Sequence, residues 1–173
     1  MTVYATLDSP LGELLLVGVE SATAPGGTAL VSLSVPGQKG GAVVQDGWRL
    51  APEAFAGIAA QLRAYFAGEL TRFDIEYAAD APGTDFQRRV WAQLDALEYG
   101  TTASYGEIAR RIGASSVQVR AVGTAIGRNP LLVVRPCHRV IGSDGSLKGY
   151  AGGLERKEAL LGLEGALSPT PTS

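Results

Sequence analysis

Apolar and polar positions in the first part of the chain predict a small sheet followed by a helix. Residues 3–7 and 13–19 are apolar with partial alternation and are expected to be strands, joined by a hairpin turn that contains Ser, Pro and Gly. Further strands are expected over 29–35 and, more briefly, over 73–77. Residues 51–68 are expected to be a helix, because large apolar side chains recur on one face at helical spacing.

Beyond residue 83 the pattern becomes mainly helical. Three capping boxes, in which a Ser or Thr is followed three residues later by Gln or Glu, begin at Thr84, Ser104 and Ser115. They open three expected helices, and a run of leucines predicts a fourth. The expected ranges are 84–97, 104–112, 116–126 and 154–164. A short buried strand over 131–134 is expected to lead to Cys137.

The order of these elements predicts an α+β protein with two domains. The first is a small N-terminal α/β domain over 1–80. The second, over 81–165, is a mainly helical C-terminal domain with a helix-turn-helix and the active-site cysteine. A linker rich in Ala, Pro and Gly over 78–83 separates them. The tail over 166–173 is rich in Ser, Thr and Pro and is predicted to be disordered.

The net charge of −2 is unevenly distributed. Residues 84–165 contain 11 lysines and arginines and 8 acidic residues, whereas the rest of the chain contains 4 and 9. Unless it arose by chance, this asymmetry suggests that one half faces a polyanion. No apolar run approaches the roughly 20 residues of a membrane helix, and the N-terminus has no signal-peptide pattern. A lone thiol without an export signal predicts a cytoplasmic location.

The only cysteine and the only histidine of the chain are adjacent, at Cys137 and His138. One cysteine cannot form a disulfide within the chain, and a zinc site normally needs three or four protein ligands, so we expect neither a metal nor another cofactor. What remains is one nucleophile with a potential base beside it. The alternative is a buried structural cysteine next to a surface histidine, because free cysteine is often a small apolar side chain.

The expected helices over 104–112 and 116–126 are short and closely linked, as in a helix-turn-helix. An ordinary helical hairpin is the commoner arrangement. The second helix favours nucleic acid because it is built mainly of small residues, which let a helix approach a groove closely, and because one arginine, Arg120, projects from it.

Several segments together closely resemble the O6-alkylguanine-DNA alkyltransferases. They cover residues 84–165 and, more weakly, 65–74. The most specific is the run Pro-Cys-His-Arg-Val over 136–140, with a Gly-Tyr segment at the right distance behind it. The other matching segments are Phe86-Gln87-Arg88-Arg89-Val90-Trp91, Ser104-Tyr105-Gly106-Glu107-Ile108-Ala109, Arg120-Ala121-Val122-Gly123, Asn129-Pro130 and Gly149-Tyr150-Ala151-Gly152-Gly153-Leu154.

The resemblance implies direct repair of DNA, in which the alkyl group of O6-alkylguanine moves irreversibly to Cys137 and each molecule acts once. It implies that His138 takes the thiol proton through a water and that Glu164 holds the imidazole. Tyr150 is implied to donate to the guanine O6, and Asn129 to brace the turn before the active site. Each of the last three residues also has a simpler structural interpretation. Tyr150 would be a core aromatic residue, Asn129 a residue that ends a helix, and Glu164 a solvated side chain.

The resemblance also implies a DNA-binding surface. The damaged base lies inside a duplex and must be flipped out; Arg120 is implied to fill the vacated space, and Tyr105 to press on the target phosphate. The recognition helix is implied to enter the minor groove, which brings Ala121 and Gly123 near DNA. Arg128 is expected to contact backbone phosphate. The expected partner is double-stranded DNA carrying O6-alkylguanine, with O4-alkylthymine as a second substrate.

The expected substrate pocket is lined by Pro136, Val140, Ala151 and Gly152. The chain departs from the family in three places. The link before Arg120 is one residue longer than usual, which lengthens the turn or changes where the helix begins. Arg135 stands where an apolar residue is typical, so it must reach solvent or find a partner. Ala151 replaces a serine of some relatives and removes a hydroxyl from the pocket wall.

Three functions compete. A single-turnover alkyltransferase, monomeric in solution and free of membranes, is favoured, and cooperative packing along DNA is left open. The alternative is a non-catalytic alkyltransferase-like protein that binds lesions without repairing them, and the presence of Cys137 argues against it. A thiol hydrolase is the third, but its histidine would normally come from a distant part of the chain.

Overall fold

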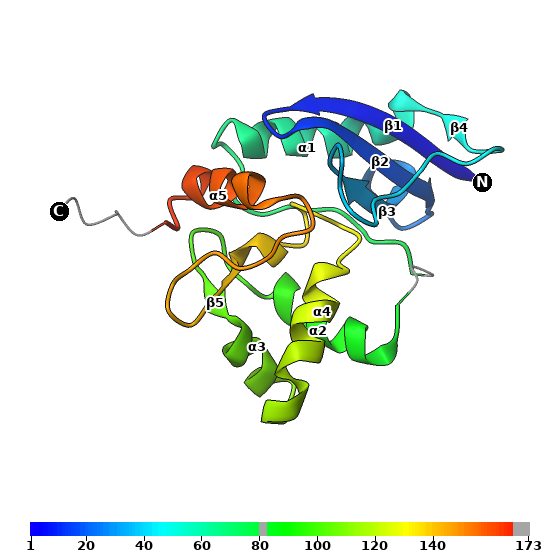
Figure 1. Cartoon of the computed structure of the whole chain (residues 1–173). Helices are drawn as coiled ribbons and strands as arrows, with labels where there is room; N and C mark the ends of the chain where they lie inside the picture. The colour runs from blue at the N-terminus through cyan, green and yellow to red at the C-terminus, as the bar shows by residue number, and fades with distance from the viewer. Residues whose placement is uncertain (80–82, 168–173) are drawn as a thin grey trace.

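The computed structural model describes residues 1–79 and 83–167, and it has the α+β class expected from the sequence. A sheet with one helix forms the N-terminal part, and helices form most of the C-terminal part (Figure 1). The strands are β1 (Thr2–Ser9), β2 (Gly12–Glu20), β3 (Thr28–Ser34), β4 (Arg49–Leu50), β5 (Ala103–Ser104) and β6 (Val140–Ile141). The α-helices are α1 (Ala56–Phe66), α2 (Asp85–Asp95), α3 (Tyr105–Arg111), α4 (Val119–Gly127) and α5 (Leu154–Leu163). The 3-10 turns are η1 (Pro25–Gly27), η2 (Pro52–Phe55), η3 (Ser116–Gln118) and η4 (Cys137–Arg139).

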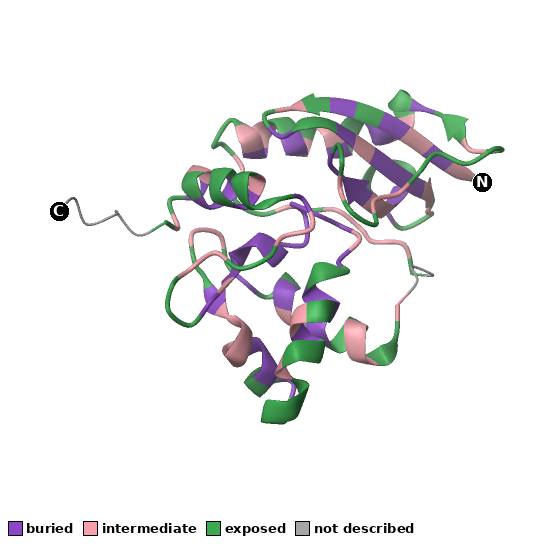
Figure 2. Cartoon of the chain, in the orientation of Figure 1, coloured by how far each residue is buried: buried purple, intermediate pink, exposed green. Residues whose placement is uncertain are grey.

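The N-terminal sheet has the strand order β3-β2-β1-β4. β1 and β2 form the predicted antiparallel hairpin, which closes at the pair Ser9 and Gly12, and β4 runs parallel to β1. Figure 2 shows buried and exposed bands alternating along β1. The buried positions include Val3, Ala5 and Leu7, and α1 packs against this strand, so one face of the sheet is closed by α1.

Two of the C-terminal helices, α2 and α3, begin where their capping boxes predict. Thr84 and Ser104 each accept a hydrogen bond from the backbone amide three residues on, and in both boxes the reciprocal side chain returns the bond. The box at Ser115 is present as well, but it opens η3, and α4 begins only at Val119. The extended link is therefore accommodated by one tight turn before the helix that carries Arg120.

Two predicted strands are wrong. Residues 73–77 contain only an isolated bridge from Tyr77 to Leu30, because the Gln61 side chain bonds both backbone groups of Asp74 and replaces a strand neighbour. Residues 131–134 likewise form one bridge, from Leu131 to Leu33, and then turn at Val133, whose φ is 70°. The short strands β4, β5 and β6 were not expected. The predicted linker and disordered tail fall partly on residues 80–82 and 168–173, which lie outside the described residues.

Arg135 joins the two parts of the chain. Its guanidinium lies 4.9 Å from the ring centre of Tyr77, which belongs to the N-terminal part, and 5.1 Å from that of Trp91 on α2. Its Nε donates to Asp95 Oδ1 at 3.3 Å. The arginine that replaces the usual apolar residue has therefore found a partner, as required of a side chain with only 11% exposure. Trp91 in turn donates to the Ala125 carbonyl and ties α2 to α4.

Candidate active site

A strained turn precedes Cys137. Asn129 is buried, and its Oδ1 accepts from the Leu131 amide at 3.0 Å. Its Nδ2 donates to the carbonyls of Arg135 at 3.0 Å and Leu131 at 3.3 Å. Inside the turn, Val133 has a φ of 70°, a left-handed conformation that costs a β-branched residue about 1–3 kcal/mol. Asn129 thus holds a backbone that local preference would not choose, which is the geometry that a bracing role requires.

His138 and Glu164 form a fully buried pair, with 2.7 Å between His138 Nε2 and Glu164 Oε2. Burial lowers the pKa of His138, while the nearby carboxylate raises it. An ionised carboxylate only accepts hydrogen bonds, so the imidazole proton lies on Nε2 and the lone pair on Nδ1. Within the described residues this buried Nδ1 has no hydrogen-bond partner. It is therefore available to take a proton.

Glu164 collects donors from several segments of the chain. Arg139 Nε donates to Oε1 at 2.7 Å, and its Nη2 donates to Oε2 at 3.0 Å. The Tyr65 hydroxyl, from α1, donates to Oε2 at 2.5 Å, and the Gly100 amide to Oε1 at 3.4 Å. Burial by itself raises the pKa of Glu164, but the bonds from the imidazole, the guanidinium and the phenol lower it to about 2. The carboxylate is ionised throughout the physiological range.

The Cys137 thiol is protonated at rest. Its residue is 4% exposed, and burial raises the pKa of the thiol to about 11, although the side chains of Asn129 and Lys157 lower it. Little thiolate is present at neutral pH, so a displacement by this sulfur needs a base to take its proton. His138, the next residue and the only histidine, is the candidate.

Lys157 is a buried cation beside the site. Its Nζ donates to the Val140 carbonyl at 2.6 Å and to the Gly149 carbonyl at 3.2 Å, and it lies 5.8 Å from the ring centre of Tyr105. Burial lowers the pKa of Lys157 to about 8. The side chain ties α5 to the segment after Cys137 and to the start of the Gly-Tyr segment.

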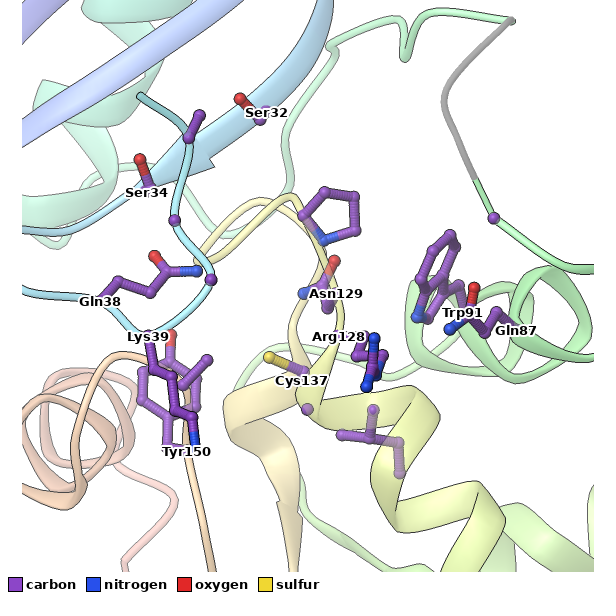
Figure 3. A pocket seen from close by; sticks show the side chains of 18 of the residues that line it. Ser32, Ser34, Gln38, Lys39, Gln87, Trp91, Arg128, Asn129, Cys137 and Tyr150 are labelled. Carbon is purple, nitrogen blue, oxygen red and sulfur yellow. The ribbon is translucent and has the colours of Figure 1, made fainter. Parts of the chain in front are cut away.

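A cleft of about 1060 Å³ lies in front of Cys137. Figure 3 shows the sulfur directed into it, with Tyr150 on one side and Asn129 on the other. One wall is formed by β3 and the loop that follows, and includes Gln38. The opposite wall comes from α2 and the end of α4, and includes Trp91. This space is large enough for a flipped purine and its substituent.

Tyr150 is placed by the glycine that follows it at residue 152. A Cβ on Gly152 would lie 2.8 Å from the Tyr150 ring, so only glycine lets the ring pack there. Burial raises the pKa of Tyr150 well above its usual value, and its hydroxyl is therefore a donor at any ordinary pH. This hydroxyl is buried, and its proton has no acceptor within residues 1–79 and 83–167, since the nearby Val133 backbone only donates to the oxygen and lowers its pKa. A buried donor without a partner at a cleft indicates that the ligand supplies the acceptor.

The outer face of α4 carries the residues predicted to contact DNA. Arg120 and Ala121 are exposed, and Arg128 follows the helix, also exposed. Tyr105 is half-buried at the start of α3; its ring lies 3.8 Å from where a Cβ on Gly123 would sit, and its hydroxyl donates to the Gly149 carbonyl at 3.5 Å. Tyr105 and Gly123 therefore lie side by side at the mouth of the cleft.

The structure divides the predicted site residues into three groups. Those that line the cleft are Cys137, Asn129, Tyr150, Ala151, Tyr105, Gly123 and Arg128. Those buried behind its surface are His138, Glu164, Pro136, Val140 and Gly152. Those on the exposed face of α4 are Arg120 and Ala121. In the part of the chain that the structure describes, no group of three or more His, Cys, Asp or Glu side chains could hold a metal ion.

Sequence reasoning did not assign site roles to Tyr65, Arg139 and Lys157. Lys157 could have been found from helical spacing, because it lies three and four residues before two buried leucines of α5 and so on the buried face. Arg139 stands inside the most specific motif. Tyr65 stands at the start of the weakly matching segment 65–74, but nothing in that segment points to Glu164, which is 99 residues away in the sequence.

The site contains one thiol, with an imidazole and a carboxylate behind it and a pair of short helices beside it. This arrangement defines a protein whose chemistry depends on a single cysteine. Comparison with family models identifies the family. Residues 2–78 match the ribonuclease-like domain, and residues 85–166 the DNA binding domain, of 6-O-methylguanine DNA methyltransferase. The chain belongs to this family, which confirms the resemblance seen in the motifs.

Individual relatives agree over almost the whole chain. A methylated-DNA–protein-cysteine methyltransferase of Mycolicibacterium paratuberculosis is 51% identical over 98% of this chain and 96% of its own. One from Methanosarcina acetivorans is 47% identical over 94% and 98%. Among solved structures, Mycobacterium tuberculosis OGT in complex with DNA has a TM-score of 0.82 at 49% identity, covering 97% of this chain and 96% of its own.

Proposed function

We propose that this protein repairs DNA directly, by moving the alkyl group of O6-alkylguanine irreversibly to Cys137. The observation that carries the proposal is the lone thiol at the cleft with His138 and Glu164 behind it, in a chain whose close relatives are named methylated-DNA–protein-cysteine methyltransferases. O4-alkylthymine is a second substrate, because it presents an alkyl group on a similar exocyclic oxygen. The protein acts as a monomer in the cytoplasm and uses no cofactor.

The transfer is a displacement at the alkyl carbon. Through a water, His138 takes the thiol proton at Nδ1, and Glu164 stabilises the imidazolium that forms. The sulfur of Cys137 forms a bond to the alkyl carbon while the bond from that carbon to O6 breaks, and its electron pair stays on the guanine. The base is restored when it gains a proton, so the net reaction moves the thiol proton to guanine and leaves a thioether.

Tyr150 stabilises the leaving group. Its buried hydroxyl, whose proton has no acceptor within the described residues, donates to O6 as negative charge develops there. Asn129 keeps the turn before Cys137 in its strained shape. Of the predicted pocket residues, Ala151 lines the cleft and contacts the base, while Pro136, Val140 and Gly152 support the cleft from behind. The thioether is stable and nothing in the site can reverse it, so each molecule reacts once.

DNA binding follows from the face of α4. A base in a duplex cannot reach a thiol that is 4% exposed, so the nucleotide must be flipped into the cleft at a cost of a few kcal/mol. Arg120 fills the space left in the stack, and Ala121 and Gly123 let the helix enter the minor groove. Tyr105 and Arg128, at the mouth of the cleft, contact the target phosphate and its neighbour. In this proposal, residues 81–165 are the DNA-binding and catalytic domain, and residues 1–80 are the N-terminal domain that supports it.

Mass spectrometry tests the proposal. After incubation with a duplex containing one O6-methylguanine, we expect the peptide with Cys137 to gain one methyl group, and the DNA to lose it. Cys137→Ala should bind the same duplex and leave the lesion intact. Tight binding by the natural chain without a mass gain would instead show a lesion-binding protein and reject the enzymatic proposal.

A further inference from the structure

One oxygen of Glu164 serves two donors at once. Oε2 accepts from His138 Nε2 at 2.7 Å and from the Tyr65 hydroxyl at 2.5 Å. The tyrosine comes from α1, in the N-terminal part, which otherwise contributes only one wall of the cleft. Figure 1 shows α1 next to α5, whose end carries Glu164.

The Tyr65 side chain is locked in this position. It is 0% exposed, and its ring packs on Phe66 at 5.3 Å, Phe73 at 5.2 Å and Tyr99 at 6.2 Å between ring centres. Burial raises the pKa of its hydroxyl, so the group stays a donor and never an acceptor towards a carboxylate. The Tyr65 hydroxyl is buried, held in one orientation by its neighbours and bonded to a charged oxygen, so it makes a strong and well-defined hydrogen bond.

We propose that Tyr65 is a positioning residue for the alkyl transfer: its hydroxyl fixes Glu164 and limits how strongly this carboxylate stabilises the protonated form of His138. The inference rests on the proposed function only for its effect on alkyl transfer. Its effect on the imidazole can be measured without any substrate.

The direction of the effect follows from competition at one oxygen. A hydrogen bond to the ionised carboxylate spreads its charge and makes it a weaker partner for an imidazolium. Without the Tyr65 hydroxyl, Oε2 has more charge to offer His138, so the pKa of His138 rises. Below its pKa the imidazole is protonated and cannot take the thiol proton. The acid limb of the transfer rate therefore moves to higher pH.

Other charged and titratable groups also face this pair. Arg139, from η4, donates to both carboxylate oxygens of Glu164. The charges of Arg139 and of Lys157, from α5, both lower the pKa of His138. Tyr99, from the loop after α2, packs against Tyr65 but donates its own hydroxyl to the Leu163 carbonyl. These groups stay in place when only the Tyr65 hydroxyl is removed.

Tyr99→Phe is the matched control for Tyr65→Phe. Both variants remove one hydroxyl from the same aromatic cluster and keep the ring, but only Tyr65 contacts Glu164. His138 is the only histidine, so one imidazole signal in an NMR pH titration reports its pKa directly. We expect Tyr65→Phe to raise this pKa by about 0.5–1, the equivalent of one net hydrogen bond, and Tyr99→Phe to leave it unchanged.

Three further measurements decide the outcome. The acid limb of single-turnover methyl transfer should shift by the same amount in Tyr65→Phe, and the shift should vanish in a Glu164→Gln background. If Tyr65→Phe fails to fold, 3-fluorotyrosine introduced at Tyr65 keeps the side chain and donates more strongly, so the pKa of His138 should fall. Two results overturn the proposal. One is a pKa of His138 that is unchanged in both the folded Tyr65→Phe protein and the fluorotyrosine protein. The other is a shift in Tyr99→Phe equal to that in Tyr65→Phe. Absence of methyl transfer with the expected imidazole shift refutes only the proposed function.

Discussion

Replacing Arg135 by leucine tests whether the arginine joins the two parts of the chain. The change keeps an apolar stem of similar length and restores the kind of residue that is typical of the family at this position. It removes the contacts to Tyr77 and Trp91 and the ion pair with Asp95. We expect Arg135→Leu to lower the stability of the protein, although leucine suits a buried position better.

The magnitude follows from those contacts. Two cation–π contacts are worth about 0.5–1 kcal/mol each, and a partly exposed ion pair about 1 kcal/mol or less. Their sum is a loss of about 1–3 kcal/mol in the free energy of unfolding. For a protein of this size, that corresponds to a fall in melting temperature of about 2–12 °C.

The loss should depend on pH. Burial raises the pKa of Asp95 above its usual 3.8, and Arg135 holds it down. In Arg135→Leu the pKa of this carboxyl in the folded protein rises further. Its ionised form therefore destabilises the folded state at any pH above the pKa that the carboxyl has in the unfolded chain. The deficit should be complete at pH 7 and shrink as the pH falls toward 4. Asp95→Asn in the leucine background should recover part of it.

Urea unfolding followed by circular dichroism at pH 7 and at pH 4.5 measures both effects, with linear extrapolation to water. Asp95→Asn alone serves as the control for loss of the carboxylate. A leucine variant as stable as the natural chain at both values of pH would refute the reasoning and leave the contacts of Arg135 without energetic consequence.

Three further predictions concern the site. Asn129→Ala removes three buried hydrogen bonds from the strained turn, so urea unfolding should show a loss of about 2–4 kcal/mol; an unchanged midpoint would contradict the bracing role. Because the pKa of Cys137 is raised to about 11, iodoacetamide should alkylate the free protein slowly at pH 7 and about tenfold faster per pH unit up to pH 9; a rate independent of pH in this range would show a thiolate at rest. Affinity for duplex DNA should fall as salt rises and fall further in Arg120→Ala, as measured by fluorescence anisotropy, and a salt-insensitive complex would argue against phosphate contacts.

Local chemistry was enough to predict much of the fold. The capping boxes at Thr84 and Ser104 fixed where two helices begin, because both partners of each box lie within four residues. The apolar run over 131–134 was misleading for the opposite reason. Its residues suit a buried strand, but the Asn129 side chain and the left-handed Val133 turn the backbone instead. The pattern of residues within 131–134 carries no information about the Asn129 side chain, which lies outside that run.

The candidate site shows the same limit. Cys137 and His138 were evident as the only residues of their kind, and the structure buries the imidazole against Glu164. The contact of Tyr65 with Glu164 was not predictable, since the two residues are 99 positions apart in the sequence. The same holds for Arg135, whose aromatic partners come from both parts of the chain.

The hydroxyl of Tyr65 on Glu164 has a consequence for chimeras. The two family models meet near residue 80 and suggest modules that could be exchanged between relatives. The carboxylate behind the reactive sulfur nevertheless takes one of its donors from the first module and the rest from the second. A hybrid would keep all donors to this carboxylate only if its borrowed amino-terminal module carried a phenol at the same place. Compatibility between the halves must therefore be judged at this buried junction.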